Sequence, residues 1–236
     1  MTDFLKTAPP ALVGSALRRR TFLRVAGASA ASAALVLAGC GKDAPAPVAP
    51  PDPNFIALQS GDLGLLNYCF LLKQLETALY QIVVTAYPAD FSAEDRALFA
   101  DLRDHELIHR QTLLALLTTN FLPTLPFNFS SFTLTTRAGV LAAAQRIEDL
   151  GTALLAGALP LFENEPLRQL LTKMLSVEAR HAALVRDLAI PGSFAGPDVV
   201  PAATGLNQAL TPTAGIALLA PYVAPVVISI ANLPTV

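Results

Sequence analysis

The segment DHELIH, residues 104–109, contains two overlapping metal-binding patterns, and the choice between them decides the fold. One pattern is His105-Glu106-x-x-His109, in which two histidines lie four residues apart. The other is Glu106-x-x-His109 alone, in which a carboxylate and an imidazole lie three residues apart. Either spacing places the pair on one face of a helix. The rest of the chain must therefore show which pattern has partners.

A second Glu-x-x-His motif lies further along the chain, at Glu178 and His181. Glu76 and Glu148, two acids in apolar helical stripes, are separated by the same offset as the two motifs (148 − 76 = 178 − 106). Each of them also precedes its own motif by one common interval (106 − 76 = 178 − 148). With seven Glu and three His in the chain, about 0.1 such motifs are expected by chance. The chain therefore contains two copies of one unit, a helix with a lone Glu followed by a helix with Glu-x-x-His.

His105 is not part of the duplicated unit, because the same offset leads from His105 to Val177. The pattern His-Glu-x-x-His is typical of zinc proteases, in which Glu106 would act as the base and Glu148 could supply a third ligand. A zinc protease therefore stays open as one alternative function. The repeat favours His105 as a surface residue or as a neighbour of a metal ligand.

Four stretches with helical spacing of apolar residues carry these motifs, at residues 60–87, 92–119, 135–159 and 164–189. Ser92 is the expected N-cap of the second helix, and Pro166 fits the first turn of the fourth. The short first and third connections predict two antiparallel hairpins. The longer connection at residues 120–133 predicts a crossover between the second and third helices. The expected fold is therefore an all-α antiparallel four-helix bundle, within residues 55–190.

Residues 191–236 form a different segment, rich in Pro and in small apolar residues. One short helix is expected there, at residues 211–220. Because the segment is too apolar to stay solvated, we expect this irregular Pro-rich C-terminal extension to pack on the bundle.

Residues 1–39 have the features of an export signal. Arg19 and Arg20 resemble the twin-arginine signature, and the apolar run that follows is too short for a membrane anchor. The run ends in Leu-Ala-Gly-Cys40, which resembles a lipoprotein cleavage box. We therefore expect export by the twin-arginine route, lipid attachment at Cys40 and a Pro/Ala-rich tether over residues 40–54. The bundle would then lie in the cell envelope, in the periplasm or on the outer surface.

The composition excludes nucleic acid as a partner. The chain carries 16 basic and 18 acidic residues, and five of the basic ones fall within the signal. No basic patch is expected, and without Trp there is little basis for a stacking platform. The membrane, reached through Cys40, is the expected partner.

The four repeated glutamates are expected to share two metal ions. Each lies in the middle of a stripe that otherwise faces the core, and a buried carboxylate without a partner costs several kcal/mol. We expect no Lys or Arg on the same stripes, whereas two divalent cations would balance four carboxylates. A mixed set of oxygen and nitrogen ligands suits Fe or Mn better than Zn. The candidate ligands are Glu76, Glu106, His109, Glu148, Glu178 and His181.

This arrangement on four successive helices resembles the ferritin-like superfamily of di-iron and di-manganese carboxylate proteins. The resemblance implies a ferritin-like bundle with two Fe or two Mn ions. The implied roles are bridging for Glu106 and Glu178, terminal for Glu76 and Glu148, and one imidazole per ion for His109 and His181.

The resemblance implies redox chemistry with O₂ or peroxide, as a ferroxidase or a manganese-catalase-like enzyme. Tyr80, one turn beyond Glu76, is a candidate redox residue or neighbour of a ligand. The alternative is a non-catalytic envelope protein in which the metal only clasps the bundle. Stress protection would fit that alternative, because the tail TPTAGIALLAPYV resembles the desiccation-related branch of the superfamily. A homodimer and an electron donor of unspecified type are the other partners that the resemblance allows.

Overall fold

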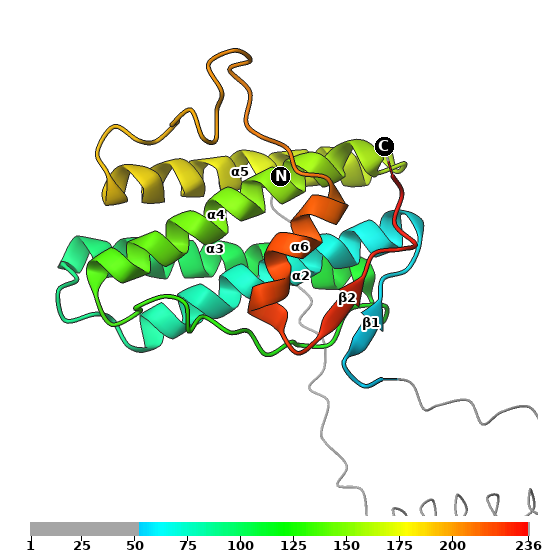
Figure 1. Cartoon of the computed structure of the whole chain (residues 1–236), viewed down its shortest axis with the longest axis horizontal. Coiled ribbons are helices and arrows are strands. Elements are labelled where there is room, and N and C mark those ends of the chain that lie inside the picture. The colour runs from blue at the N-terminus through cyan, green and yellow to red at the C-terminus, as the bar shows by residue number, and fades with distance from the viewer. Residues whose placement is uncertain (1–51, 236) are drawn as a thin grey trace, which may run out of the picture. The chain divides into compact units, whose positions relative to one another are not determined.

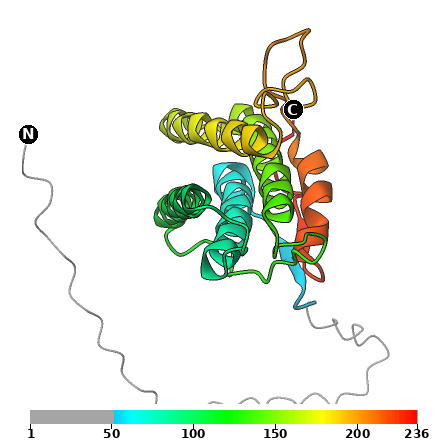
Figure 2. The same ribbon diagram turned by 90° about the vertical axis from the view of Figure 1, so that its left-hand side faces the viewer.

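Four long helices form the bundle in the computed structural model, which describes residues 52–235. They are α2 (Gly61–Thr85), α3 (Ala93–Leu117), α4 (Arg137–Ala158) and α5 (Glu165–Ala189) (Figure 1). The pairs α2/α3 and α4/α5 form two hairpins, and α2 also packs on α4 (Figure 2). The predicted all-α four-helix bundle is confirmed, and each helix end lies within two residues of its expected position.

The twin-arginine signature and Cys40 lie outside the described residues. Within residues 52–235, none of the helices combines the length and the hydropathy that a membrane crossing requires.

The helix starts follow from local hydrogen bonding. The Ser92 hydroxyl accepts a hydrogen bond from the Asp95 amide, and the Asp95 carboxylate accepts one from the Ser92 amide. This reciprocal pair satisfies two amides that the first turn of α3 would otherwise leave free. The Asn164 side chain caps α5 in a similar way, with Pro166 in the first turn. The predicted Ser92 cap and the predicted position of Pro166 are therefore confirmed.

The central element is α2, in which every residue from Gly64 to Glu76 is buried. A helix that is buried on all sides needs cover on all sides. That cover comes from α3, from α4, from the crossover (residues 118–136) and from the C-terminal extension. Every polar side chain in this part of α2 is therefore surrounded by protein rather than by water.

Two buried amides of α2 hold the crossover in place. The Asn67 side chain accepts a hydrogen bond from the Leu122 amide at 2.8 Å and donates one to the Asn120 carbonyl at 2.7 Å. Further along the helix, Gln74 accepts from the Leu125 amide at 3.1 Å. The crossover thus runs along α2, and these three of its backbone polar groups are satisfied by side chains of that helix.

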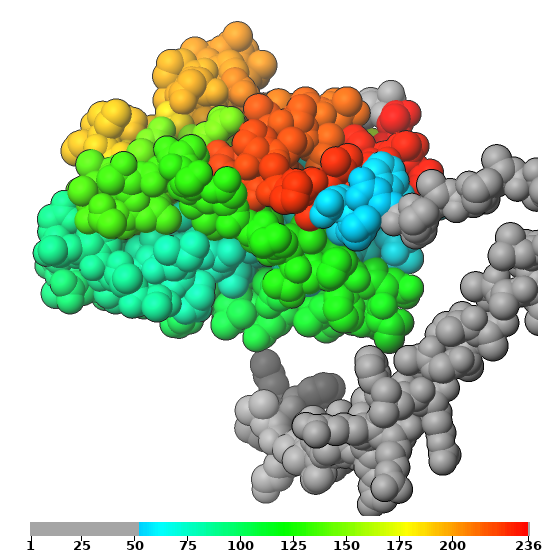
Figure 3. Space-filling model, turned by 60° about the horizontal axis from the view of Figure 1, so that its bottom comes forward, coloured from blue at the N-terminus to red at the C-terminus, as the bar shows by residue number. Residues whose placement is uncertain are grey.

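The C-terminal extension packs on the bundle through α6 (Pro212–Val223). At Gly215 an added Cβ would lie 2.1 Å from both Leu154 and Tyr68, so only glycine permits this close approach. The chain then returns to the start of the described region, where β2 (Val227–Ser229) pairs in parallel with β1 (Phe55–Ala57). The two segments lie side by side on the surface of the molecule (Figure 3). This small sheet was not expected, because three-residue strands have no periodicity to detect.

Residues between α5 and α6 are held by one buried cation. The Arg186 guanidinium donates to Asp149 at 2.6 Å, to Asp198 at 2.6 Å and to the Ser193 carbonyl at 3.0 Å. This arginine therefore joins α4, α5 and the segment that follows α5.

Candidate metal centre

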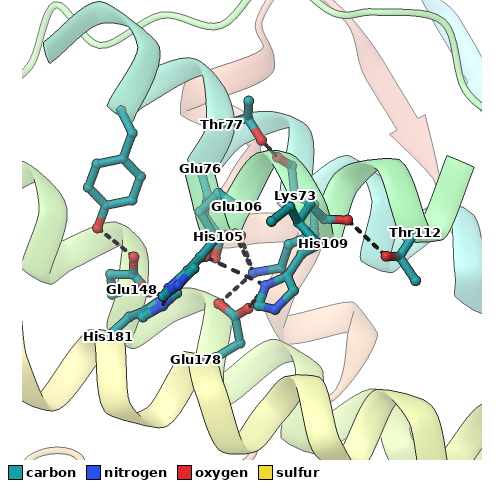
Figure 4. A network of polar contacts seen from close by, with 12 residues as sticks. Lys73, Glu76, Thr77, His105, Glu106, His109, Thr112, Glu148, Glu178 and His181 are labelled. Atoms are coloured by element: carbon teal, nitrogen blue, oxygen red, sulfur yellow. Dashed lines mark hydrogen bonds and ion pairs between the residues drawn. The ribbon is translucent and has the colours of Figure 1, made fainter. Parts of the chain in front are cut away.

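All six side chains predicted as metal ligands meet in the interior of the bundle (Figure 4). The four glutamates have no exposed surface. Donor atoms of Glu106, Glu148, Glu178 and His181 all lie within 4.8 Å of one another. Glu76 and His109 lie beside this group through their contacts with Lys73 and with the central carboxylates.

The doubled unit explains the convergence. Each hairpin contributes one glutamate from its first helix and a Glu-x-x-His pair from its second. Residues three apart share a helix face, so Glu106 and His109 point inward together, as do Glu178 and His181. The resulting centre has two similar halves, with Glu106 and Glu178 between them.

The expectation that no Lys or Arg lies among these acids was wrong, because the Lys73 ammonium is at their centre. Its Nζ lies 2.9 Å from Glu106 Oε2 and 2.5 Å from Glu178 Oε2, and it also forms an ion pair with Glu76. Only the contact with Glu106 has the angles of a hydrogen bond. Lys73 precedes Glu76 by three residues, so it shares the face of α2 that carries the acid.

The buried charges shift one another's pKa. Burial alone would lower the pKa of Lys73, but Glu106, Glu178 and Glu76 outweigh it and hold that pKa well above its usual range. Burial would raise the pKa of Glu106, whereas Lys73 and two histidines, His109 and His181, lower it well below normal. Lys73 and Glu106 therefore form a charged pair inside the bundle.

Glu76 and Glu148 behave differently from Glu106. Burial raises the pKa of Glu76, and the attraction of Lys73 does not cancel the effect. Burial, Glu106 and Glu178 together raise the pKa of Glu148. The positively charged groups near Glu76 and Glu148 therefore do not offset the effect of burial on these two carboxylates.

The two predicted histidine ligands present the same nitrogen to the carboxylates. His109 Nδ1 lies 2.6 Å from Glu178 Oε1, and His181 Nδ1 lies 3.0 Å from Glu106 Oε1. Burial would lower the pKa of His109, but Glu106 and Glu178 raise it to about 9. Both Nδ1 atoms therefore face the two central carboxylates.

His105 lies on the outer side of His181. Its Nδ1 is 3.0 Å from His181 Nε2, and the two rings stack with centroids 5.3 Å apart. His105 is exposed and does not join the carboxylate group. The arrangement favours Glu106-x-x-His109 over the zinc-protease pattern, and it places His105 against one of the predicted ligands, His181.

Tyr80 and Gly151 lie against the other two glutamates, Glu148 and Glu76. The Tyr80 hydroxyl donates a hydrogen bond to Glu148 Oε1 at 2.5 Å, and both groups are fully buried. Burial and the adjacent Glu148 raise the pKa of Tyr80 well above its usual value. At Gly151 a Cβ would lie 2.1 Å from Glu76 Oε1, so the glycine leaves room for that carboxylate.

The donor set fits a divalent transition metal. Oε1 of Glu76 and Oε2 of Glu148 accept no hydrogen bond within the described part of the chain. The other oxygen of Glu76 and both oxygens of Glu178 contact Lys73 or His109. Buried carboxylate oxygens without donors are unfavourable unless a cation binds them. Three carboxylates and one imidazole are ligands that Fe and Mn accept readily.

A pocket of about 410 Å³ leads from the surface to the histidines, between α3 and α5. Its lining is apolar apart from three imidazoles and one guanidinium, and it consists of His105, Ile108, His109, Val177, Arg180, His181 and Leu184. A small molecule in this pocket would touch the imidazole side of the centre first.

Sequence reasoning missed Lys73, Asn67 and Gln74, all of them polar residues of α2. The detectable signal for Lys73 was its spacing of three residues from Glu76. The two amides gave no comparable signal, because their partners are backbone groups of the crossover.

Comparison with known proteins agrees with the geometry. A search of curated proteins gave no match. A family model described as a ferritin-like domain matches residues 61–190, which include all four helices and all six predicted ligands. The chain therefore belongs to the ferritin-like domain family.

Proposed function

We propose that the chain binds Fe or Mn at this centre and catalyses oxidative chemistry with O₂ or peroxide, as a ferroxidase or a catalase-like enzyme. The carrying observation is the buried group of Glu106, Glu148, Glu178 and His181, with donor atoms within 4.8 Å of one another. When bound there, the metal would supply the electrons that O₂ or peroxide accepts.

The protein's own residues would orient the ligands and admit the reactant. His105 holds His181 through Nε2, which leaves Nδ1 directed at the carboxylates. Tyr80 keeps one oxygen of Glu148 engaged and leaves the other free. The pocket beside these imidazoles has room for a small reactant.

The test uses the full chain, purified in detergent and loaded anaerobically with Fe(II) or Mn(II). Consumption of O₂ and of H₂O₂ is then measured with electrodes. Activity should be lost in Glu178→Gln, which keeps the shape of the ligand but removes its charge. It should be retained in Lys173→Met, which alters an exposed lysine of α5. Absence of turnover with either metal would eliminate the enzymatic proposal.

Export and anchoring are part of the same proposal. Arg19, Arg20 and the Leu-Ala-Gly-Cys40 box support a twin-arginine lipoprotein signal. In the host cell, Cys40→Ala should move the protein from the membrane fraction to the soluble envelope fraction. If the unchanged chain is already in the soluble fraction, the anchor does not exist.

A structural role for the metal is the second candidate, and Lys73 favours it. A resident ammonium already neutralises part of the carboxylate cluster, so part of the cluster holds the helices together without chemistry. Under this alternative, chelation lowers the melting temperature, while no O₂ or peroxide is consumed by the loaded protein. The same purified protein thus separates the two candidates.

A further inference from the structure

We infer that the centre takes one divalent ion, and that the Lys73 ammonium fills the place a second ion would need. The single ion would be held by Glu106, Glu148, Glu178 and His181. This inference rests on the proposed metal binding and replaces the expected pair of ions with one ion and one lysine.

The contacts of Lys73 divide the centre into an occupied half and a free half. One half consists of Glu76 and His109 beside the two central glutamates, and the other of Glu148 and His181 beside the same two. The Nζ atom forms ion pairs with Glu76 and with Oε2 of both central glutamates. No ion pair within 4.0 Å joins Lys73 to Glu148 in the described region. The ammonium therefore belongs to the half that contains Glu76.

The grouping of donor atoms agrees with this division. The four residues whose donors converge within 4.8 Å include Glu148 and His181 but neither Glu76 nor His109. Oε2 of Glu148 also has no hydrogen-bond donor among the described residues, so it remains available to an ion. The free half is thus the half with a ready ligand set.

The contacts of the ammonium also limit the number of ions. A second divalent ion would have to bind the Oε2 atoms of Glu106 and Glu178, which the Lys73 ammonium already contacts. Ion and ammonium would then lie within contact distance of the same oxygens. Like charges that close in a buried site repel strongly, because the surrounding dielectric is low.

The two copies of the repeated unit differ at the position of Lys73, so the difference between the two halves is present in the sequence itself. The offset that relates Glu76 to Glu148 leads from Lys73 to Gln145, which is neutral and lines a surface groove with Asp90 and Arg137. The second copy of the unit therefore supplies no cation to the centre from this position. The half that contains Glu148 and His181 thus depends on a bound ion for its charge balance.

The test is a count of bound ions in the full chain in detergent, by calorimetric titration with Mn(II) and by elemental analysis after desalting. We expect one ion per chain in the unchanged protein and two in Lys73→Met, in which the side chain keeps its length but loses its charge. Lys173→Met, the matched exposed control, should bind one. Two ions in the unchanged protein would overturn the inference while leaving metal binding intact. A single ion in a folded Lys73→Met would also overturn it.

A second measurement does not depend on any variant. With two equivalents of Mn(II), the electron paramagnetic resonance spectrum of the unchanged chain should show isolated Mn(II), half of it free in solution. A spectrum of an exchange-coupled Mn pair would refute the single-ion centre. If neither Mn(II) nor Fe(II) binds to the chain or to Lys73→Met, metal binding itself fails, and the inference fails with it.

Discussion

Lys73→Met should destabilise the protein strongly when no metal is supplied. Lys73 is 1 % exposed and forms ion pairs with three carboxylates that have no exposed surface. Removal of one partner from a buried ion pair costs about 3–5 kcal/mol, because the remaining charge stays buried without compensation. Glu76 can escape part of this cost by taking up a proton, since its pKa is already raised, whereas the lowered pKa of Glu106 shows how much it depends on Lys73. We therefore expect a loss of about 3–5 kcal/mol in the free energy of unfolding.

The assay is urea-induced unfolding of the full chain at pH 7 with a chelator present, followed by circular dichroism. For a domain of this size, the loss corresponds to a fall in melting temperature of about 6–20 °C. Lys173→Met should change the free energy of unfolding by less than about 0.5 kcal/mol, because that lysine is exposed. Mn(II) should restore much of the lost stability in Lys73→Met. A loss below about 1 kcal/mol, the range of a solvent-exposed ion pair, would refute the reasoning.

Tyr80→Phe should lower the free energy of unfolding by about 1–3 kcal/mol, because it leaves a buried oxygen of Glu148 without its donor; an unchanged denaturation midpoint would contradict this contact. Asp95→Asn should cost about 1–2 kcal/mol at pH 7, since two hydrogen bonds from Arg137 lower the pKa of Asp95 from 3.8 to about 2. That contribution is complete above pH 3.8 and disappears as the pH falls through 2, so unfolding curves of Asp95→Asn and the unchanged chain should converge in acid and diverge towards neutrality. Gly151→Ala should cost about 1 kcal/mol in thermal unfolding, because overpacking against a carboxylate oxygen at 2.1 Å outweighs the gain in helix propensity; a stabilised variant would show that the carboxylate moves aside freely.

The sequence predicts the bundle well because the information is local and repeated. Helical spacing of apolar residues, the Ser92 cap and the Pro166 first turn place the helices to within two residues. The repeat offset identifies six inward-facing residues without any structure, since a repeat superposes one hairpin on the other. These signals survive in a single sequence because each lies within one helix or at a fixed distance along the chain.

The features that the sequence did not predict depend on neighbours distant in the chain. The apolar stripe of α2 does not reveal that the rest of the helix is buried as well, because the crossover and the C-terminal extension cover it. The Lys73 side chain reaches the carboxylate cluster, where its partners come from α3 and α5 as well as from α2. Likewise, His105 acquires its role only because α5 brings His181 against it. No pattern within α2 or α3 alone contains this information.

The pairing of β1 with β2 has a mechanical consequence for a tethered protein. The Leu58 amide donates to the Ser229 carbonyl at 2.9 Å, and the Val227 amide donates to the Asn54 carbonyl at 2.7 Å. Under the proposed lipid anchor, any pull from the membrane enters the domain at β1. That force would have to break the hydrogen bonds between β1 and β2 before it reached the first turn of α2. The pairing with β2 would therefore protect the helices that surround the carboxylates from the pull.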